Sequence, residues 1–192
     1  MALKLYGSIP SPFVRRVRLY LENTDYEMVA VNVYDDAERA QYANVSPIKK
    51  LPVLKDGEEV VMDSRVIYYH LRQKFGKGFP DTKEQNLLAA MDAFADSLVI
   101  IMLGKRSELD VSKDALIFKL QLERLPDILS WLNLQAEEGA FSQWDFPAMS
   151  LYAILDWMVF RELYDISDYP ALLKILADNQ RREIVQATDP RG

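Results

Sequence analysis

A proline stands at position 52, inside the run Lys49-Lys50-Leu51-Pro52-Val53-Leu54, which otherwise has the pattern of a strand. Proline lacks a backbone N–H, so in a sheet it marks an edge, a bulge or a cis bond. The hairpin pattern that follows ends at Asp63-Ser64, at the predicted start of a helix, where free backbone N–H groups favour an anion. Ser11 precedes Pro12 at the start of another predicted helix and also carries a hydroxyl. These three elements predict one ligand site built largely from backbone.

The first part of the chain alternates strand and helix patterns. Strands are predicted around residues 3–5 and over 28–33, and the helix between them has Val14, Val17 and Leu21 on its apolar face. Two further strand patterns flank Asp56-Gly57, which is a strong hairpin signal. With a helix over residues 64–75 the order is β-α-β, an irregular stretch, then β-β-α. This order indicates a thioredoxin-like domain, a small mixed sheet with helices.

The composition changes at residues 77–81, which we interpret as a linker. Strand patterns disappear after it, and Thr82 with Gln85 fits a capping box at a helix start. The predicted elements beyond the linker are helices from residue 82 to a break near 104, over 114–135, over 147–163 and from 170, with an irregular tail over 186–191. We therefore predict a thioredoxin-like α+β domain over residues 1–76 and an all-α domain over residues 82–192.

Composition excludes several kinds of chemistry. The chain has 192 residues and no cysteine, so disulfides, thiolate metal sites and a cysteine nucleophile are excluded. The net charge is −6, with acids and bases mixed along the chain, and we expect no nucleic-acid partner because phosphate binding needs concentrated positive charge. The single histidine, His70, has no metal-ligand set around it, and no metal is expected. Neither a signal peptide nor an apolar run of about 20 residues is recognised, which favours a cytoplasmic protein without membrane contact.

In this order and spacing, the motifs resemble those of the cytosolic glutathione transferase family over essentially the whole chain. The stretch over residues 11–18 is similar to the N-terminal motif of serine-type bacterial and plant tau-like members. Residues 46–54 resemble the family segment Asn-Pro-x-x-Lys-Val-Pro-Val-Leu, and residues 63–67 resemble Glu/Asp-Ser-x-x-Ile. The ending Gln-Ala-Thr-x-Pro-Arg is also similar to bacterial members. The resemblance implies a thioredoxin-like domain followed by an all-helical domain.

The resemblance also implies which residue contacts the glutathione sulfur. Ser11 would donate a hydrogen bond to the sulfur, because a hydroxyl and a helix N-terminus both stabilise the thiolate, which is the reactive form. The alternative is that Ser11 is only an N-cap, with Pro12 as the first helical residue. Tyr6, near the end of the first strand, is a rival for the same contact, although packing at the strand end is favoured for it. Phe13 is implied as part of the site for the second substrate, with the first long helix around residues 94–105.

The remaining implied contacts hold the rest of glutathione. Lys50 would meet a carboxylate, and the backbone of Leu51, beside a cis Pro52, would pair with the ligand like an added strand. Ser64 with its helix N-terminus would take the γ-glutamyl carboxylate, and Asp63 would take the ammonium group. The alternatives are a solvated lysine, an ordinary edge-strand proline and a helix cap without a ligand.

Three arginines follow Ser11 closely: Arg15, Arg16 and Arg18. Cations in the first turns of a helix are slightly unfavourable for the helix. We expect them to add positive potential for an anionic ligand, or otherwise to be solvated or paired with nearby acids.

The resemblance therefore implies a homodimeric glutathione transferase that attacks a small apolar electrophile and uses glutathione as co-substrate without a metal. Two alternatives stay open. One is a non-catalytic adaptor with the same fold, such as the starvation-induced factors that associate with RNA polymerase. The other is a protein that carries apolar ligands. The sequence does not specify the natural electrophile, because acceptor pockets consist of scattered apolar side chains.

Overall fold

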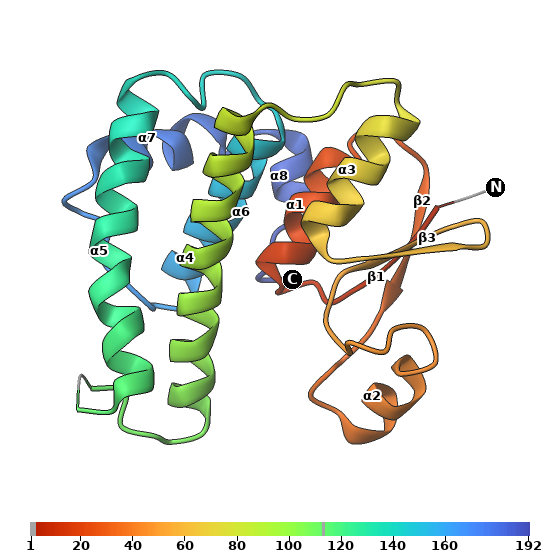
Figure 1. The fold of residues 1–192 in the computed structure, drawn as a ribbon, viewed down its shortest axis with the longest axis horizontal. Helices are drawn as coiled ribbons and strands as arrows, with labels where there is room; N and C mark the ends of the chain where they lie inside the picture. Colours follow the sequence, from red (N-terminus) through yellow and green to blue (C-terminus); the bar gives the residue numbers. More distant parts are fainter. Residues whose placement is uncertain (1–2, 113) are drawn as a thin grey trace. The chain divides into compact units, whose positions relative to one another are not determined.

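The computed structural model describes residues 3–112 and 114–192. They form two compact units (Figure 1). The N-terminal unit contains the residues up to Pro80 together with Arg181–Gly192, and the helical unit is Asp81–Gln180. The sequence predicted that the second domain extends over residues 82–192. The structure corrects this boundary, because the C-terminal segment (residues 181–192) packs within the N-terminal unit.

The N-terminal unit has the predicted thioredoxin-like order around one four-stranded sheet, with strand order β2-β1-β3-β4. β1 pairs in parallel with β2 and antiparallel with β3, and β3 and β4 form the predicted hairpin. The strands are β1 (Leu3–Gly7), β2 (Tyr26–Ala30), β3 (Val53–Asp56) and β4 (Glu59–Met62). The helices are α1 (Pro12–Tyr20), α2 (Asp36–Tyr42), α3 (Ser64–Lys74) and α8 (Glu183–Ala187). The short helix α2 lies where an irregular stretch was predicted, and α8 overlaps the predicted irregular tail at residues 186 and 187.

The two faces of this sheet bury different clusters. On one face, alternate residues of β1 pack with the apolar sides of α1 and α3, as the period of two along a strand requires. That cluster contains Leu3, Leu5, Val14, Val17, Leu21, Leu54, Val61, Ile67 and Leu71. On the other face Tyr6 packs against Val31, Tyr42 and Val53. Gly7 lets α1 lie close to β1, because a Cβ at this position would come within 2.5 Å of Val14 Cγ1.

The helical unit consists of α4 (Thr82–Arg106), α5 (Leu116–Glu137), α6 (Phe146–Phe160) and α7 (Pro170–Asn179). α6 is buried nearly all round, as its apolar sequence predicted, and Asp145 caps it by accepting the N–H of Ala148 at 3.2 Å. The start of α4 is capped by Asp81, which accepts the N–H of Glu84 at 2.8 Å. The predicted capping box that began at Thr82 is therefore wrong by one residue.

By length and composition α4 could cross a membrane, since an 18-residue stretch of it has a mean hydropathy of 1.9. The expectation that the chain has no apolar run long enough to span a membrane is therefore wrong by length and composition. Half of that window is buried inside the protein. The buried residues of α4, among them Leu88, Met91 and Phe94, face the core, so its apolar character is that of a core helix.

An ion-pair cluster connects the β3–β4 hairpin to α3. The carboxylate of Asp56 accepts hydrogen bonds from Lys74 Nζ at 2.8 and 3.0 Å and lies 2.9 Å from His70 Nε2. These contacts lower the pKa of Asp56, with the hydrogen bond from Lys74 as the largest cause and that from His70 next. His70 is thus a packed residue of this cluster.

We expect Asp56→Asn to lower the free energy of unfolding at neutral pH by roughly 1–2 kcal/mol, which is below the full range of about 1.5–3 kcal/mol for hydrogen bonds to charged groups because Lys74 is 42% exposed. Because the folded pKa lies below the ordinary value of 3.8, the stabilisation is present above that value and is lost as the pH falls through the folded pKa. Urea unfolding between neutral pH and about pH 2 should therefore show a smaller pH dependence in the variant. Glu27→Gln, which removes an exposed pair with Lys4, is the control and should change little. Identical pH dependence in wild type and Asp56→Asn would contradict this account.

Candidate functional site

Three segments leave the sheet of the N-terminal unit at the same end. In the strand register Tyr6 lies opposite Val53, and Val53 lies opposite Met62. The loop after β1, the segment before β3 and the turn after β4 are therefore neighbours, since paired strands lie about 4.8 Å apart. The predicted site residues lie in these three segments or directly after them. The structure thus brings the separate sequence motifs to one place.

Ser11 is the N-cap of α1, and its hydroxyl accepts the N–H of Val14 at 3.3 Å. Pro12 follows as the first helical residue, as predicted. A serine hydroxyl has one proton to donate in addition to its acceptor lone pairs. Capping uses only an acceptor, so the proton of the half-buried Ser11 hydroxyl is left to donate to a ligand. The capping role and the proposed contact to sulfur are therefore compatible.

The peptide bond between Leu51 and Pro52 is cis, as the resemblance implied. Pro52 is buried, and Leu51 is half-buried against both apolar clusters. Within residues 3–112 and 114–192, the backbone N–H and C=O of Leu51 make no hydrogen bond to other backbone groups. A donor and an acceptor next to each other at the end of a sheet can pair with an extended ligand as a strand does.

Tyr42 supports this segment, and the sequence analysis did not identify it. Its hydroxyl donates to the carbonyl of Lys50 at 2.9 Å. Tyr42 is 3% exposed, and burial raises its pKa to about 12, so the hydroxyl keeps its proton at neutral pH. The side chain of Lys50 is exposed, and in the described part of the chain its ammonium group has no ion-pair partner. The structure therefore holds the Lys50 backbone and leaves its charge accessible.

Asp63 is the N-cap of α3, and its exposed carboxylate accepts the N–H groups of Arg65 at 2.8 Å and Val66 at 3.3 Å. Its φ of 75° lies in a region that few residues other than glycine adopt. Such backbone strain is found most often at functional sites. Asp63 is therefore a helix cap, and the same carboxylate can also meet a ligand ammonium group.

Ser64, the first residue of α3, is 1% exposed. Its hydroxyl accepts two hydrogen bonds from Arg16, from Nε at 3.0 Å and from Nη2 at 2.6 Å. The Arg16 guanidinium also lies 5.3 Å from the centre of the half-buried Phe13 ring. Ser64 therefore joins α3 to α1 in this structure, and a ligand reaches its hydroxyl only after a local movement.

Tyr6, the rival to Ser11, lies on the sheet face opposite α1 and α3. Its ring packs 6.3 Å from the ring of Tyr42, in the cluster with Val31 and Val53. This position supports the packing role that the sequence favoured for Tyr6.

The alternative that the α1 arginines are solvated is wrong for two of them. Arg15 and Arg16 are each 1% exposed. Arg16 binds Ser64, and Arg15 binds the C-terminal segment through the Val185 carbonyl. Arg18 is half-buried and donates to the Ala187 carbonyl at 3.2 Å. Residues so far apart in sequence carry no joint signal, which is why the sequence analysis missed these contacts.

Among the described residues 3–112 and 114–192, no group of three or more His, Asp or Glu side chains is arranged to hold a metal ion. The site chemistry available in the N-terminal unit consists of a hydroxyl, backbone groups, a lysine and an aspartate.

Comparison with known proteins agrees with the motifs. Residues 5–80 match the family model for the glutathione S-transferase N-terminal domain. The chain is 41% identical over 76 residues to glutathione S-transferase 4 of Zea mays, a match that covers 38% of this chain and 34% of that protein. It is 38% identical over 76 residues to a zeta-class glutathione S-transferase of Euphorbia esula, a match that again covers 38% of this chain and 34% of that protein. The matched region thus spans about a third of the length of these curated relatives.

Solved structures extend the likeness to the whole fold. A glutathione S-transferase of Methylobacillus flagellatus with glutathione bound has a TM-score of 0.84 at 22% identity, covering 97% of this chain and 98% of that one. A glutathione transferase family member of Pseudomonas fluorescens, also with bound glutathione, has a TM-score of 0.83 at 24% identity, covering 97% of this chain and 98% of that one. The fold is that of the glutathione transferases. By sequence, residues 5–80 match the glutathione S-transferase N-terminal domain family, and over its length the chain has the fold of the solved glutathione transferases. The serine-type, tau-like subtype stays a prediction.

We expect Tyr42→Phe to loosen the segment before β3, because it removes the hydrogen bond to Lys50. The free energy of unfolding should fall by about 1 kcal/mol, and amide hydrogen exchange should rise in residues 49–51. Because the folded pKa of Tyr42 is raised, its contribution is complete below the ordinary value of 10.0 and is lost as the pH rises toward about 12.

The measurement is chemical unfolding from neutral pH to about pH 12, compared between wild type and Tyr42→Phe. Tyr34→Phe is the control, since Tyr34 is 53% exposed. If the two variants have equal stability and equal alkaline sensitivity, the role assigned to Tyr42 is wrong.

Proposed function

We propose that the protein is a glutathione transferase that binds glutathione in its N-terminal unit and activates the thiol for attack on a small apolar electrophile. The observation that carries this proposal is that Ser11 and Leu51 belong to segments that leave the sheet at the same end. Ser11 offers a hydroxyl proton at the start of α1, and Leu51 offers a donor and an acceptor that no other backbone group among the described residues uses. The glutathione bound in the two solved bacterial relatives also supports it.

Thiol activation follows from the position of Ser11. A free thiol has a pKa of about 8.5, and only the thiolate is strongly nucleophilic. The Ser11 hydroxyl would donate to the sulfur, and the N-terminus of α1 contributes roughly half a positive charge. The buried Arg15, one turn further along α1, adds positive potential to the same region. All three effects stabilise the thiolate and therefore lower the pKa of the bound thiol.

The rest of the tripeptide would be held mainly by backbone. The cysteinyl main chain would pair with Leu51, the glycine carboxylate would meet Lys50, and the ammonium group would meet Asp63. The γ-glutamyl carboxylate would lie at the start of α3 near Ser64, whose hydroxyl proton is not used by the bonds it accepts from Arg16. Phe13 remains the residue proposed for contact with the second substrate.

The reaction balances without a metal or redox partner. The thiol loses its proton to solvent, and the thiolate sulfur then attacks an electrophilic carbon. A carbon–sulfur bond forms while the bond to the leaving group breaks, and that group departs with its electron pair. The catalytic contribution of the protein is electrostatic, since a donor already in place costs no reorganisation when charge develops.

The alternatives are an adaptor that does not bind glutathione and a carrier of apolar ligands. An adaptor needs no accessible donor at Ser11, and a carrier needs no thiol activation. Calorimetry with glutathione separates the adaptor from the other two, and turnover of a chloronitrobenzene separates the enzyme from the carrier. A cytoplasmic location, with α4 as a core helix, is part of the same proposal.

Ser11→Ala should retain glutathione binding within a few-fold but lower turnover of 1-chloro-2,4-dinitrobenzene by roughly 100-fold, a typical loss for one oxyanion donor. The pKa of the bound thiol, followed by ultraviolet absorbance of the thiolate, should rise. Ser11→Thr keeps a hydroxyl and should retain most of the activity.

Asp81→Ala is the control for the loss of the α1 cap, because it removes the cap of α4 at a similar cost of about 1 kcal/mol. This control should leave the thiol pKa unchanged. Wild type that gives no heat with glutathione overturns the proposed function. An active Ser11→Ala with an unshifted thiol pKa overturns only the role of Ser11.

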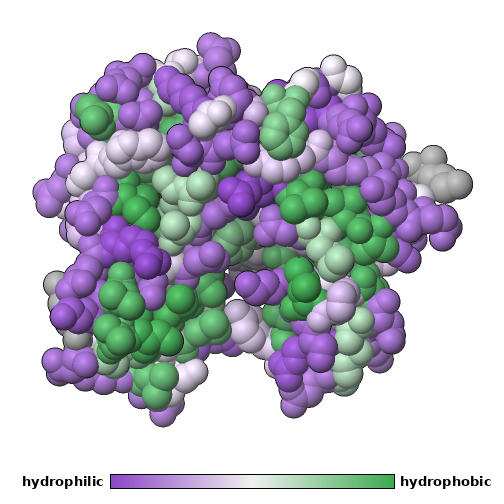
Figure 2. Space-filling view, viewed as in Figure 1, coloured by the Kyte–Doolittle hydropathy of each residue, from purple (hydrophilic) through white to green (hydrophobic). Residues whose placement is uncertain are grey.

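A homodimer is proposed on the basis of two exposed apolar surfaces. On the helical unit, Leu116, Ile117 and Leu120 at the start of α5 are 68%, 57% and 47% exposed. On the N-terminal unit, Val66 (49% exposed) and Phe79 (70% exposed) line a cavity of about 730 Å³ beside β4 and α3. Figure 2 shows hydrophobic side chains gathered over the adjoining ends of α4 and α5, and separately over α3 and the neighbouring hairpin. A second copy of the chain would cover such surfaces.

Light scattering after gel filtration should give twice the 22.1 kDa mass of one chain. Ile117→Glu and Val66→Glu should each shift the protein toward monomer, because each places a charge in an apolar interface. Leu173→Glu, at an exposed leucine of α7, is the matched control and should stay dimeric. A monomeric wild type, or dimers that survive both substitutions, would refute this interface.

A further inference from the structure

The C-terminal segment returns to the N-terminal unit, although the whole helical unit separates the two in sequence. Its helix, α8 (Glu183–Ala187), has five residues. Isolated helices of this length are not stable in water. Contacts with the N-terminal unit must therefore hold α8 in its helical form.

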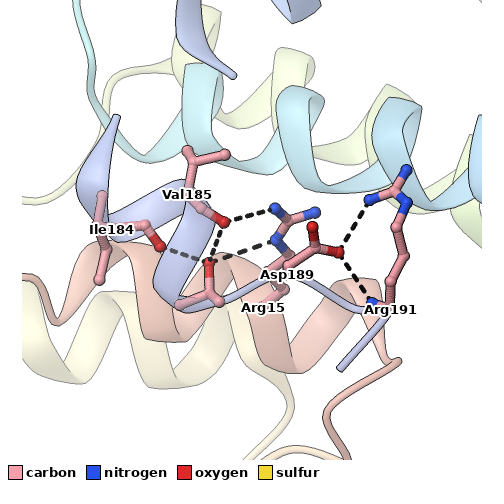
Figure 3. Close-up of polar contacts among 6 residues, drawn as sticks. Arg15, Ile184, Val185, Asp189 and Arg191 are labelled. Carbon is pink, nitrogen blue, oxygen red and sulfur yellow. Dashed lines mark hydrogen bonds and ion pairs between the residues drawn. The ribbon is translucent and has the colours of Figure 1, made fainter. Parts of the chain in front are cut away.

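Arg15 of α1 makes these contacts from a buried position (Figure 3). Its Nη2 donates to the Val185 carbonyl at 3.0 Å, and its Nε donates to Thr188 Oγ1 at 3.4 Å. Thr188 is 2% exposed, and its hydroxyl donates to the Ile184 carbonyl at 2.7 Å. Arg18, one turn further along α1, donates to the Ala187 carbonyl at 3.2 Å. Two guanidinium groups thus bind the C-terminal end of α8, where the helix dipole is negative.

Asp189 supplies negative charge near the buried Arg15 cation. Burial opposes ionisation of Asp189, but hydrogen bonds from Arg191 and the charges of Arg191 and Arg15 lower its pKa overall. The Asp189 carboxylate accepts the Arg191 backbone N–H at 2.9 Å and its Nη1 at 3.0 Å. A buried cation needs such hydrogen bonds and opposite charge, because an unpaired one costs several kcal/mol. The C-terminal segment therefore supplies both requirements for Arg15.

The same arginine is tied to the proposed thiol site. The backbone N–H of Arg15 donates to the Ser11 carbonyl at 2.9 Å, which is the first hydrogen bond of α1. The next residue, Arg16, donates to Ser64 of α3. The first turn of α1 is thus attached to α3 through Arg16 and to the C-terminal segment through Arg15.

We propose that Arg15 is a positioning residue for thiol activation: held by residues 185–188, it fixes the first turn of α1 and with it the Ser11 hydroxyl. This inference rests on the proposed function and adds the C-terminal segment to the site. Glutathione binding through Lys50 and Leu51 does not depend on Arg15. Loss of Arg15 should therefore affect the reaction of the bound thiol more than binding.

The test compares Arg15→Met, Arg15→Lys and Thr188→Val in the full chain, with Gln186→Ala as the control at an exposed position of α8. Arg15→Met should reduce kcat roughly 10- to 100-fold, with KM for glutathione changed only a few-fold, as expected for a small displacement of a reacting group. The pH profile of kcat/KM should shift to higher pH. Arg15→Lys, which keeps the charge but not the planar fork, should be intermediate. Gln186→Ala should match wild type.

Hydrogen exchange provides a measurement that does not need activity. The amides of residues 14–17 and 184–188 should exchange faster in Arg15→Met and, to a smaller extent, in Thr188→Val. If Arg15→Met does not fold, Thr188→Val provides the test in its place. Faster exchange together with a shifted pH profile supports the inference. An active wild type whose variants keep the wild-type pH profile and α1 exchange overturns it. A wild type that does not bind glutathione overturns the proposed function instead.

Discussion

The burial of two arginines on one short helix is the constraint on which the N-terminal unit depends. A guanidinium removed from water is tolerated only when its N–H groups are bound and its charge is balanced. Arg16 donates two of its N–H groups to Ser64, whereas Arg15 donates to Val185 and Thr188 and has the charge of Asp189 nearby. Each partner belongs to a different part of the chain. The position of α1 is therefore determined jointly by α3 and by the C-terminal segment.

Local signals were sufficient to predict most of the N-terminal unit. The Asp56-Gly57 turn between two strand patterns predicted the β3–β4 hairpin, and the apolar spacing of Val14 and Val17 predicted α1. α2 was missed because its sequence, Asp-Ala-Glu-Arg-Ala-Gln-Tyr, has no apolar face of helical period, and its first turn depends on the Asp35 cap. The start of α4 was misplaced by one residue because both Asp81 and Thr82 are good N-caps.

The long-range contacts could not be predicted in this way. The C-terminal segment was assigned to the helical domain because sequence order was the only guide to its partner. Its true partners are arginines about 170 positions earlier, and a carbonyl acceptor leaves no trace in the sequence because every residue has one. The same reason explains Tyr42, whose contact is with the Lys50 backbone and not with a side chain. Side-chain motifs predicted the members of the site, whereas the supports of the site are backbone contacts.

The choice between an enzyme and an adaptor can be argued from Leu51. A half-buried backbone N–H or C=O without a partner costs roughly 1–3 kcal/mol unless water or a ligand binds it. In the described structure both groups of Leu51 are free of backbone partners, while the carbonyl of the preceding residue is held by a buried tyrosine. A protein that used this fold only as a scaffold would gain stability if other backbone groups bonded to the N–H and C=O of Leu51. Keeping the segment open and rigid, beside a hydroxyl with a proton to donate, makes sense when an extended ligand with a sulfur atom occupies it.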